Sequence, residues 1–164
     1  LSVIPSVLKN PLLYYEYDVQ EGDTPEIVAH KYYGDANRYW IVMFSNQMMD
    51  PQWDWPLDYY NLVQYVEDKY TNPQGIHSYE KVITTTELAS NTVTTNRYTI
   101  SEDEYDSVVE ETRTITTNTG DVLYELTKSS LTNYEYEVRE NNKKRQIYIL
   151  RPEFIDSFII LGNL

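Results

Sequence analysis

Cysteine is absent from this chain of 164 residues, and glycine and histidine are scarce, with five and two copies. The lack of cysteine excludes disulfides, thiolate metal sites and a cysteine nucleophile. No phosphate-binding glycine loop, dinucleotide fingerprint or Gly-x-Ser-x-Gly elbow is present. The only imidazoles, His30 and His77, are too few for a zinc site of ordinary composition. We therefore expect no enzyme activity, no cofactor and no metal, and we assign no residue a catalytic role.

Long apolar runs are missing as well. No stretch approaches the roughly 18 uninterrupted apolar residues of a membrane-spanning helix, so we expect no membrane span. Basic residues are in the minority, with 13 Lys and Arg against 26 Asp and Glu, and the formal net charge is −13. Such a surface repels nucleic-acid backbones, so the expected partner is a protein with a basic or neutral surface.

Tyrosine, in contrast, is abundant, with 17 copies. Its ring is largely apolar and its tip is polar, which suits interfaces that are partly wet. Tyrosine also fills β-strands well. Composition alone leaves both explanations open.

Residues 17–34 have the pattern of a strand, a tight turn and a capped helix. The first four alternate between apolar and polar residues, as a strand does. Gly22 can adopt the positive φ of a tight turn, and Thr24 is a good N-cap before Pro25 at the first helical position. Gly34 suits the residue after the helix. We expect a strand over 17–20 and a helix over 25–33.

Two more helices are indicated downstream. Trp40, Met43 and Phe44 have the spacing of one helical face. A third helix is expected to begin after Asp58, because an apolar stripe follows this good N-cap residue. The stripe consists of Tyr59, Leu62, Val63, Val66 and Tyr70.

Beyond residue 75 threonine, valine, tyrosine and glutamate dominate, which favours β-structure. Ser101 has capping-box spacing and is expected to open a short helix through Val109. A hairpin loop is expected at 118–120, and a turn at 141–143 is expected to join the last two strands into a hairpin. A short helix is expected from Pro152. The expected strands are 79–86, 92–100, 111–117, 121–127, 133–140 and 145–150.

The order of strand, Gly-Asp-Thr turn, two helices and asparagine resembles a LysM domain. A longer set of residues is similar to the LysM-containing baseplate wedge subunit of contractile-tailed, T-even-like phages, the gene product fifty-three family. The matching blocks span about 14–72 and 132–156, whereas 76–131 match no pattern we can name. The N-terminal residues that carry the resemblance are Glu21 to Pro25, Tyr32 to Gly34, Tyr39, Trp40, Asn46, Asp50, Pro51 and Asp54 to Pro56; the C-terminal ones are Tyr134 to Glu137, Glu140 to Ile147 and Leu150 to Phe154.

The resemblance implies an α+β fold. It consists of a small LysM-like β-α-α unit with a third helix, followed by a β-rich C-terminal extension that ends in a hairpin and a short helix. The expected ranges are an extended arm at 1–15, a LysM-like domain with its additional helix at 16–72 and a β-rich region at 73–164.

The resemblance also implies a structural subunit of the tail baseplate wedge that joins neighbouring wedge proteins during assembly. Its partners would be other wedge subunits and the sheath-initiating subunit, in a hetero-oligomer without nucleic acid. The protein would be made in the host cytoplasm and located in the virion tail.

Three groups of residues are candidates for contacts with partners. The apolar arm packs either on its own domain or on a neighbour. The tryptophans either cover the small core or anchor a partner. The basic segment is either a solvated hairpin tip or a dock for an acidic patch. The candidates are Ile4, Val7 and Leu8 in the arm, Trp53, Trp55 and Tyr59 in the middle, and Lys143, Lys144 and Arg145 near the end.

Binding of peptidoglycan or chitin is the alternative function, because LysM domains often hold such polymers in a shallow groove. By position, the groove would be lined by Gly22, Asp23, Thr24, Pro25 and Asn46. The sequence departs from the LysM pattern at 50–57, where the expected second strand is replaced by a segment rich in tryptophan and proline. This departure puts the far wall of the groove in doubt.

Overall fold

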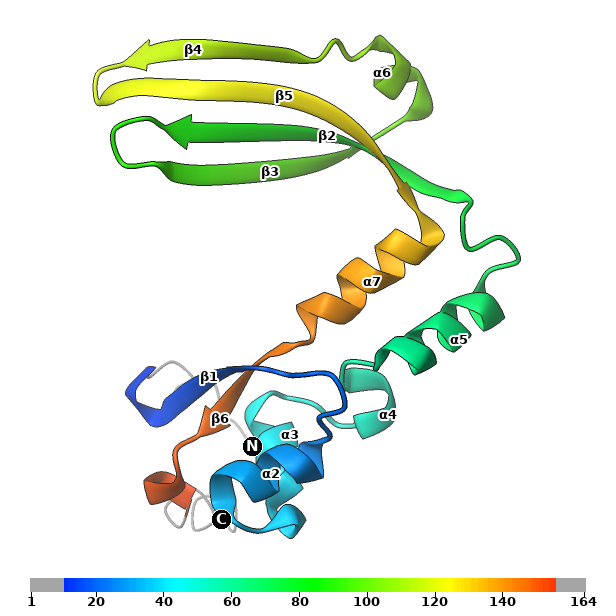
Figure 1. Cartoon of the computed structure of the whole chain (residues 1–164), viewed down its shortest axis with the longest axis vertical. Helices are drawn as coiled ribbons and strands as arrows, with labels where there is room; N and C mark the ends of the chain where they lie inside the picture. Colours follow the sequence, from blue (N-terminus) through cyan, green and yellow to red (C-terminus); the bar gives the residue numbers. More distant parts are fainter. Residues whose placement is uncertain (1–10, 156–164) are drawn as a thin grey trace. The chain divides into compact units, whose positions relative to one another are not determined.

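The computed structural model describes residues 11–155 and contains helices and two antiparallel sheets (Figure 1). The described residues divide into two compact units, one of 11–64 with 138–155 and one of 65–137. The elements in chain order are η1 (Pro11–Leu13), β1 (Tyr14–Asp18), α2 (Pro25–Tyr33), η2 (Ala36–Arg38), α3 (Tyr39–Ser45), α4 (Pro51–Asp54), α5 (Tyr59–Lys69), β2 (Ile76–Glu87), β3 (Thr92–Ile100), α6 (Glu102–Ser107), β4 (Glu111–Thr117), β5 (Gly120–Thr132), α7 (Asn133–Lys143), β6 (Gln146–Leu150) and η3 (Pro152–Phe154).

The first unit is built on the antiparallel pair of β1 and β6, whose register runs from Tyr14 opposite Leu150 to Asp18 opposite Gln146. Helices α2 and α3 pack against this pair and supply much of its core. Burying each valine, isoleucine or methionine of this core stabilises the fold by roughly 1.5–3 kcal/mol relative to leaving the side chain exposed. The buried cluster consists of Val19, Val28, Ala29, Val42, Met43, Trp55, Ile147 and Ile149.

Helix α2 has the bounds and caps that its sequence predicts. The hydroxyl of Thr24 accepts a hydrogen bond from the backbone N–H of Ile27 at 3.3 Å, and Pro25 occupies the first position. Gly34 ends the helix in the left-handed conformation with φ of 70°, where a residue with Cβ is strained.

Helix α3 is present where it was expected, and Met43 of the expected face is buried. Trp40 of the same expected face is 43% exposed, whereas Ile41 and Val42 are fully buried. The helix is apolar over nearly its whole circumference, so periodicity alone cannot choose the face that meets the core.

The expected strand over 133–140 is wrong, because this segment is helix α7. Its start is a capping box: Thr132 Oγ1 accepts from the N–H of Glu135, and the Glu135 carboxylate accepts from the N–H of Thr132. The terminal hairpin is therefore wrong as well. Strand β6 lies close to the expected 145–150, but its partner is β1 at the other end of the chain.

The second unit contains a sheet with the strand order β3-β2-β5-β4. The strands expected at 92–100 and 111–117 are confirmed, and β2 and β5 are longer than expected. Residues 118–119 form the expected tight hairpin loop, since Thr117 pairs with Gly120. Ser101 caps α6 by accepting from the N–H of Glu104 at 3.2 Å.

The compact units group segments differently from the expected ranges. Residues 138–155 belong with the N-terminal unit because β6 pairs with β1. The helix expected from Pro152 begins as the 3-10 turn η3, and Ile155 is buried in a small cluster with Tyr14, Ile41 and Leu150. The arm residues Ile4, Val7 and Leu8 lie outside the described residues.

Candidate functional site

The turn between β1 and α2, where a LysM glycan groove was expected to begin, is held by its own side chains. The Asp23 carboxylate accepts hydrogen bonds from the Tyr17 hydroxyl, the Gln20 N–H and Lys31 Nζ. Burial opposes ionisation of Asp23, but these three donors outweigh it and lower the pKa of Asp23 below its ordinary value. Gly22 has φ of 82°, as the turn requires.

The indole of Trp55 occupies the space beside this turn. Its Nε1–H donates to the carbonyl oxygen of Asp23 at 2.9 Å, and the side chain is only 6% exposed. Trp55 belongs to the main core cluster, against which Met48 of the loop after α3 also packs. The structure therefore places Trp55 in the core and not among the exposed residues that are candidates for partner contacts.

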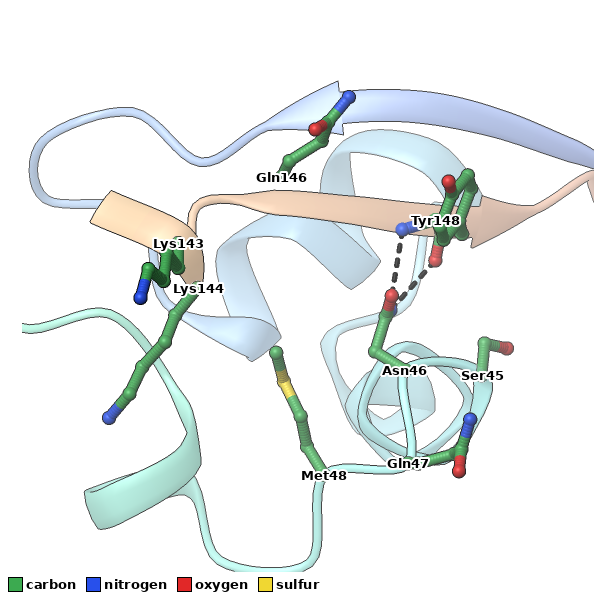
Figure 2. A pocket seen from close by; sticks show the side chains of 8 residues that line it. All are labelled: Ser45, Asn46, Gln47, Met48, Lys143, Lys144, Gln146 and Tyr148. Carbon is green, nitrogen blue, oxygen red and sulfur yellow. Dashed lines mark hydrogen bonds between the residues drawn. The ribbon is translucent and has the colours of Figure 1, made fainter. Parts of the chain in front are cut away.

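Asn46, at the end of α3, holds the outer edge of β6. Its Oδ1 accepts from the N–H of Tyr148 at 2.7 Å, and its Nδ2 donates to the carbonyl oxygen of Tyr148 at 2.8 Å (Figure 2). Nδ2 also donates to the carbonyl oxygen of Val42. This amide thus replaces a neighbouring strand at one residue of β6. Both N–H groups of Nδ2 donate, and Oδ1 accepts, within the fold.

The basic segment lies at the end of α7 and in the turn before β6, not at a hairpin tip. Lys143 forms an ion pair with Glu140 one helical turn earlier. Lys144 Nζ donates to the carbonyl oxygen of Trp53 at 2.6 Å. Arg145 donates to the carbonyl oxygen of Val19 at 3.0 Å and to the Glu21 carboxylate at 3.1 Å.

Both lysines of the basic segment border an open groove of about 450 Å³ in the first unit. Figure 2 shows Lys143 and Lys144 on one side, Asn46 on the other, and Met48 between them. The groove combines amide and ammonium groups with one thioether, a set suited to polar contacts with a neighbouring chain. Its lining residues are Ser45, Asn46, Gln47, Met48, Lys143, Lys144, Gln146 and Tyr148.

Large side chains are exposed around α4 and the start of α5, in the first unit. Trp53 and Tyr59 are each 59% exposed, and Tyr60 is 83% exposed with its ring edge against Tyr59. Met49, in the loop before α4, is 93% exposed. We call these four residues the aromatic surface. Sequence reasoning singled out Trp53 and Tyr59 but missed Met49 and Tyr60, although Tyr60 falls outside the apolar stripe of its helix.

The two histidines lie in different surroundings. His77 stacks on Tyr136 with ring centroids 3.8 Å apart, and its Nδ1 lies 3.1 Å from Asn133 Oδ1. His30 is exposed on α2. Among residues 11–155, no group of three or more His, Cys, Asp or Glu side chains is placed to hold a metal ion. In the same described range, no helix has the length and apolar character needed to cross a membrane.

The first unit presents large exposed aromatic side chains and an open polar groove, features that suit contacts with other proteins. The family of base plate wedge protein 53 has a sequence model that matches residues 8–161, so the chain belongs to this family. It is a structural component of the phage tail baseplate, where it assembles with other baseplate proteins. A search of curated proteins found no match.

Proposed function

We propose that this subunit joins neighbouring wedge proteins during baseplate assembly through a LysM-like unit that binds protein and not polysaccharide. Elements β1, α2, α3 and β6 have the strand-helix-helix-strand order of a LysM domain. In this reading the second strand is supplied by β6, and residues 51–145 are inserted before it. The insertion accounts for the missing second strand at 50–57.

The observation that carries the proposal is the burial of Trp55 against the turn after β1. Trp55 fills space beside Asp23, and the carbonyl oxygen there is already bonded to the indole. Asn46, on the other expected wall, is bonded to Tyr148. A sugar would have to displace these contacts, and each hydrogen bond lost would cost about 0.5–1.5 kcal/mol.

The aromatic surface is the proposed contact region for neighbouring wedge subunits. Tryptophan and tyrosine are enriched among the residues that dominate binding energy at interfaces. Trp53 also lies beside the groove, because its carbonyl oxygen accepts from Lys144. We extend the proposal to Lys143 and Lys144, which would contact acidic groups on a wedge subunit or on the sheath-initiating subunit.

Complementation during infection tests the proposal. Cells infected with phage that lack this subunit would be supplied with wild-type chain, with the double variant Trp53→Ala/Tyr60→Ala, or with the control Trp40→Ala. Trp40 is an exposed aromatic residue of the same unit that lies outside the aromatic surface. We expect the double variant to leave unjoined wedges in a sedimentation gradient, and the control to restore complete baseplates. Complete baseplates with the double variant would exclude the aromatic surface as the contact region.

Glycan binding is tested by incubating the chain with purified peptidoglycan and with chitin. We expect the protein to stay in the supernatant. Retention that is lost on changing Asp23 and Thr24 together, with the fold intact by circular dichroism, would favour the glycan function instead.

A further inference from the structure

The sheet of the second unit has two chemically different faces. Residues opposite one another in neighbouring strands share a face, as do alternate residues along a strand. Ile83 lies opposite Leu126, and Ile115 lies opposite Val122. Tyr124 falls between Leu126 and Val122 on β5 and shares their face. We call these five residues the apolar patch.

The opposite face is lined mainly by hydroxyl groups. Eight threonines from all four strands share it, as the register of the strands requires. Threonine suits a strand and tolerates water. The buried Val82 and Leu131 also lie on this face. The threonines are Thr84, Thr86, Thr95, Thr99, Thr112, Thr114, Thr116 and Thr127.

The apolar patch has little cover within its own unit. Helix α6 lies over one end of the same face, where the Tyr105 ring is 4.7 Å from that of Tyr79 and Lys128 Nζ donates to the Tyr105 carbonyl oxygen. All five patch residues are half-buried or exposed. An antiparallel sheet normally packs one face and leaves the other in water.

The apolar core of this unit is correspondingly small. Among residues 65–137, the buried apolar side chains are those of Val66, Val82 and Leu131. A domain normally buries its apolar sheet face under a second layer. The face that carries the apolar patch is therefore suited to receive a second layer from outside the unit.

Charge indicates what kind of surface would supply that layer. In residues 65–137 acidic side chains outnumber basic ones by fourteen to five. Each basic side chain already contacts an acidic group or a carbonyl oxygen within the unit; these are Lys69, Lys81, Arg97, Arg113 and Lys128. The patch face carries Glu87 and Glu111 together with Lys81, Arg113 and Lys128, and the Arg113 guanidinium lies over the Tyr124 ring. Helix α6, over one end of this face, adds Glu102, Asp103, Glu104 and Asp106. Acidic side chains on this face and on α6 therefore outnumber basic ones by six to three, which favours a basic surface over a second copy of the same face.

We propose that the apolar patch is the docking surface for a neighbouring baseplate protein that presents an apolar centre with a basic rim. The inference rests on the proposed role in assembly and assigns part of it to the second unit. The apolar centre supplies the area removed from water, while the acidic rim of this chain selects the partner and its orientation.

A matched pair of double variants tests the apolar part of this inference. Ile115→Thr/Leu126→Thr removes apolar side chains from the patch, and Val93→Thr/Leu123→Thr removes a similar amount from the threonine face. Both keep residues that are favourable in strands. The probe is wedges purified from cells infected with phage lacking this subunit, titrated with the added chain and measured by co-sedimentation. We expect the patch variant to bind at least about tenfold more weakly and the control to bind within about twofold of wild type.

A second comparison tests the charge of the partner and changes only one side chain of the patch. Ile115→Lys and Ile115→Glu both place a charge at one site on the edge strand β4. Against a basic rim the lysine variant should bind at least about fivefold more weakly than the glutamate variant, and the difference should shrink at high salt. Equal binding of the two would overturn the basic partner.

The remaining outcomes separate this inference from the proposed function. If wild-type chain binds wedges and the patch double variant binds equally well, the apolar patch is not the dock, and the role in joining wedges stands. If wild-type chain does not bind wedges, the proposed function fails first. If free wild-type chain dimerises in sedimentation equilibrium and the patch variant does not, the occupant is a second copy, which also overturns this inference.

Discussion

Asn46 and Tyr148 are 102 residues apart in the chain, and one side-chain amide of the first satisfies both backbone groups of the second at 2.7 and 2.8 Å. The bonds tie the end of α3 to the outer edge of β6. They connect the two distant segments that make up the first unit, and they keep an unpaired strand edge from facing the groove.

The replacement Asn46→Ala should therefore destabilise the chain by about 1–3 kcal/mol, because it removes three hydrogen bonds that each contribute about 0.5–1.5 kcal/mol net. Asn46→Asp replaces the donating amide nitrogen with a carboxylate oxygen that faces the carbonyl oxygens of Val42 and Tyr148, so this repulsion should make its cost at least as large. The measurement is the midpoint of urea unfolding followed by circular dichroism. Asn37→Ala is the control, since Asn37 is exposed and its side-chain amide bonds with its neighbour Asp35. Equal midpoints for Asn46→Ala and Asn37→Ala would contradict the role of Asn46.

Substitutions at the two neighbouring tryptophans should differ in their effect on stability. Trp55→Ala removes a buried side chain and should cost about 3–5 kcal/mol, whereas Trp55→Phe loses the bond to Asp23 and should cost less. Trp53→Ala should change the unfolding free energy by less than about 0.5 kcal/mol, because most of the Trp53 side chain is exposed. Thermal unfolding monitored by calorimetry provides the comparison. A larger stability loss for Trp53→Ala than for Trp55→Ala would show that the core is elsewhere.

Gly34 provides a test of backbone strain with no contribution from crowding. Its φ is 70°, and a Cβ built there meets no atom within 4 Å. Gly34→Ala should therefore cost about 1 kcal/mol through conformation alone. Gly34→Asn should cost less, because asparagine tolerates the left-handed region. The order of the two urea midpoints checks the prediction, and the reverse order would contradict it.

Local signals allowed the well-capped elements to be predicted from the sequence. Thr24, Pro25 and Gly34 define α2 by chemistry that acts within a few residues, and Ser101 does the same for α6. Helix α7 has an equally local signal, the capping box of Thr132 and Glu135. The alternate positions of Tyr134 and Tyr136 in the same segment favoured a strand instead.

Features that depend on distant segments could not be predicted in the same way. Nothing in residues 14–18 specifies a pairing with 146–150, because any amphipathic strand offers the same backbone groups. The buried indole of Trp55 donates its hydrogen bond to the backbone carbonyl oxygen of Asp23. Every residue type has such a carbonyl group, so the sequence does not identify this partner. In α5, Leu62 and Val66 of the expected stripe are buried, whereas Val63 is half-buried and Tyr59 is 59% exposed. Val63→Asp should therefore cost less than Val66→Asp.

Glu137 should make stability depend on pH through its contacts in the second unit. Its buried carboxylate accepts from Lys69 Nζ at 2.8 Å and from the Tyr70 hydroxyl at 2.7 Å. Burial alone would raise the pKa of Glu137, but these hydrogen bonds and the charge of Lys69 lower it below its ordinary 4.5. Because the pKa in the folded state lies below that in the unfolded state, the stabilisation is present above about pH 4.5 and is lost as pH falls through the folded-state value.

Glu137→Gln should accordingly destabilise the chain at pH 7 by about 1–3 kcal/mol and should flatten the fall in stability below about pH 4.5. The exposed Glu67→Gln on α5 is the matched control, and it should leave both the unfolding free energy and its pH slope nearly unchanged. Urea unfolding midpoints between pH 3 and 7, about one unit apart, measure the slope for each variant. Glu137→Gln lacks the carboxylate that takes up the proton at low pH. If stability falls with decreasing pH as steeply in this variant as in wild type, other carboxylates cause the acid sensitivity. This conclusion would hold for any loss of stability at pH 7.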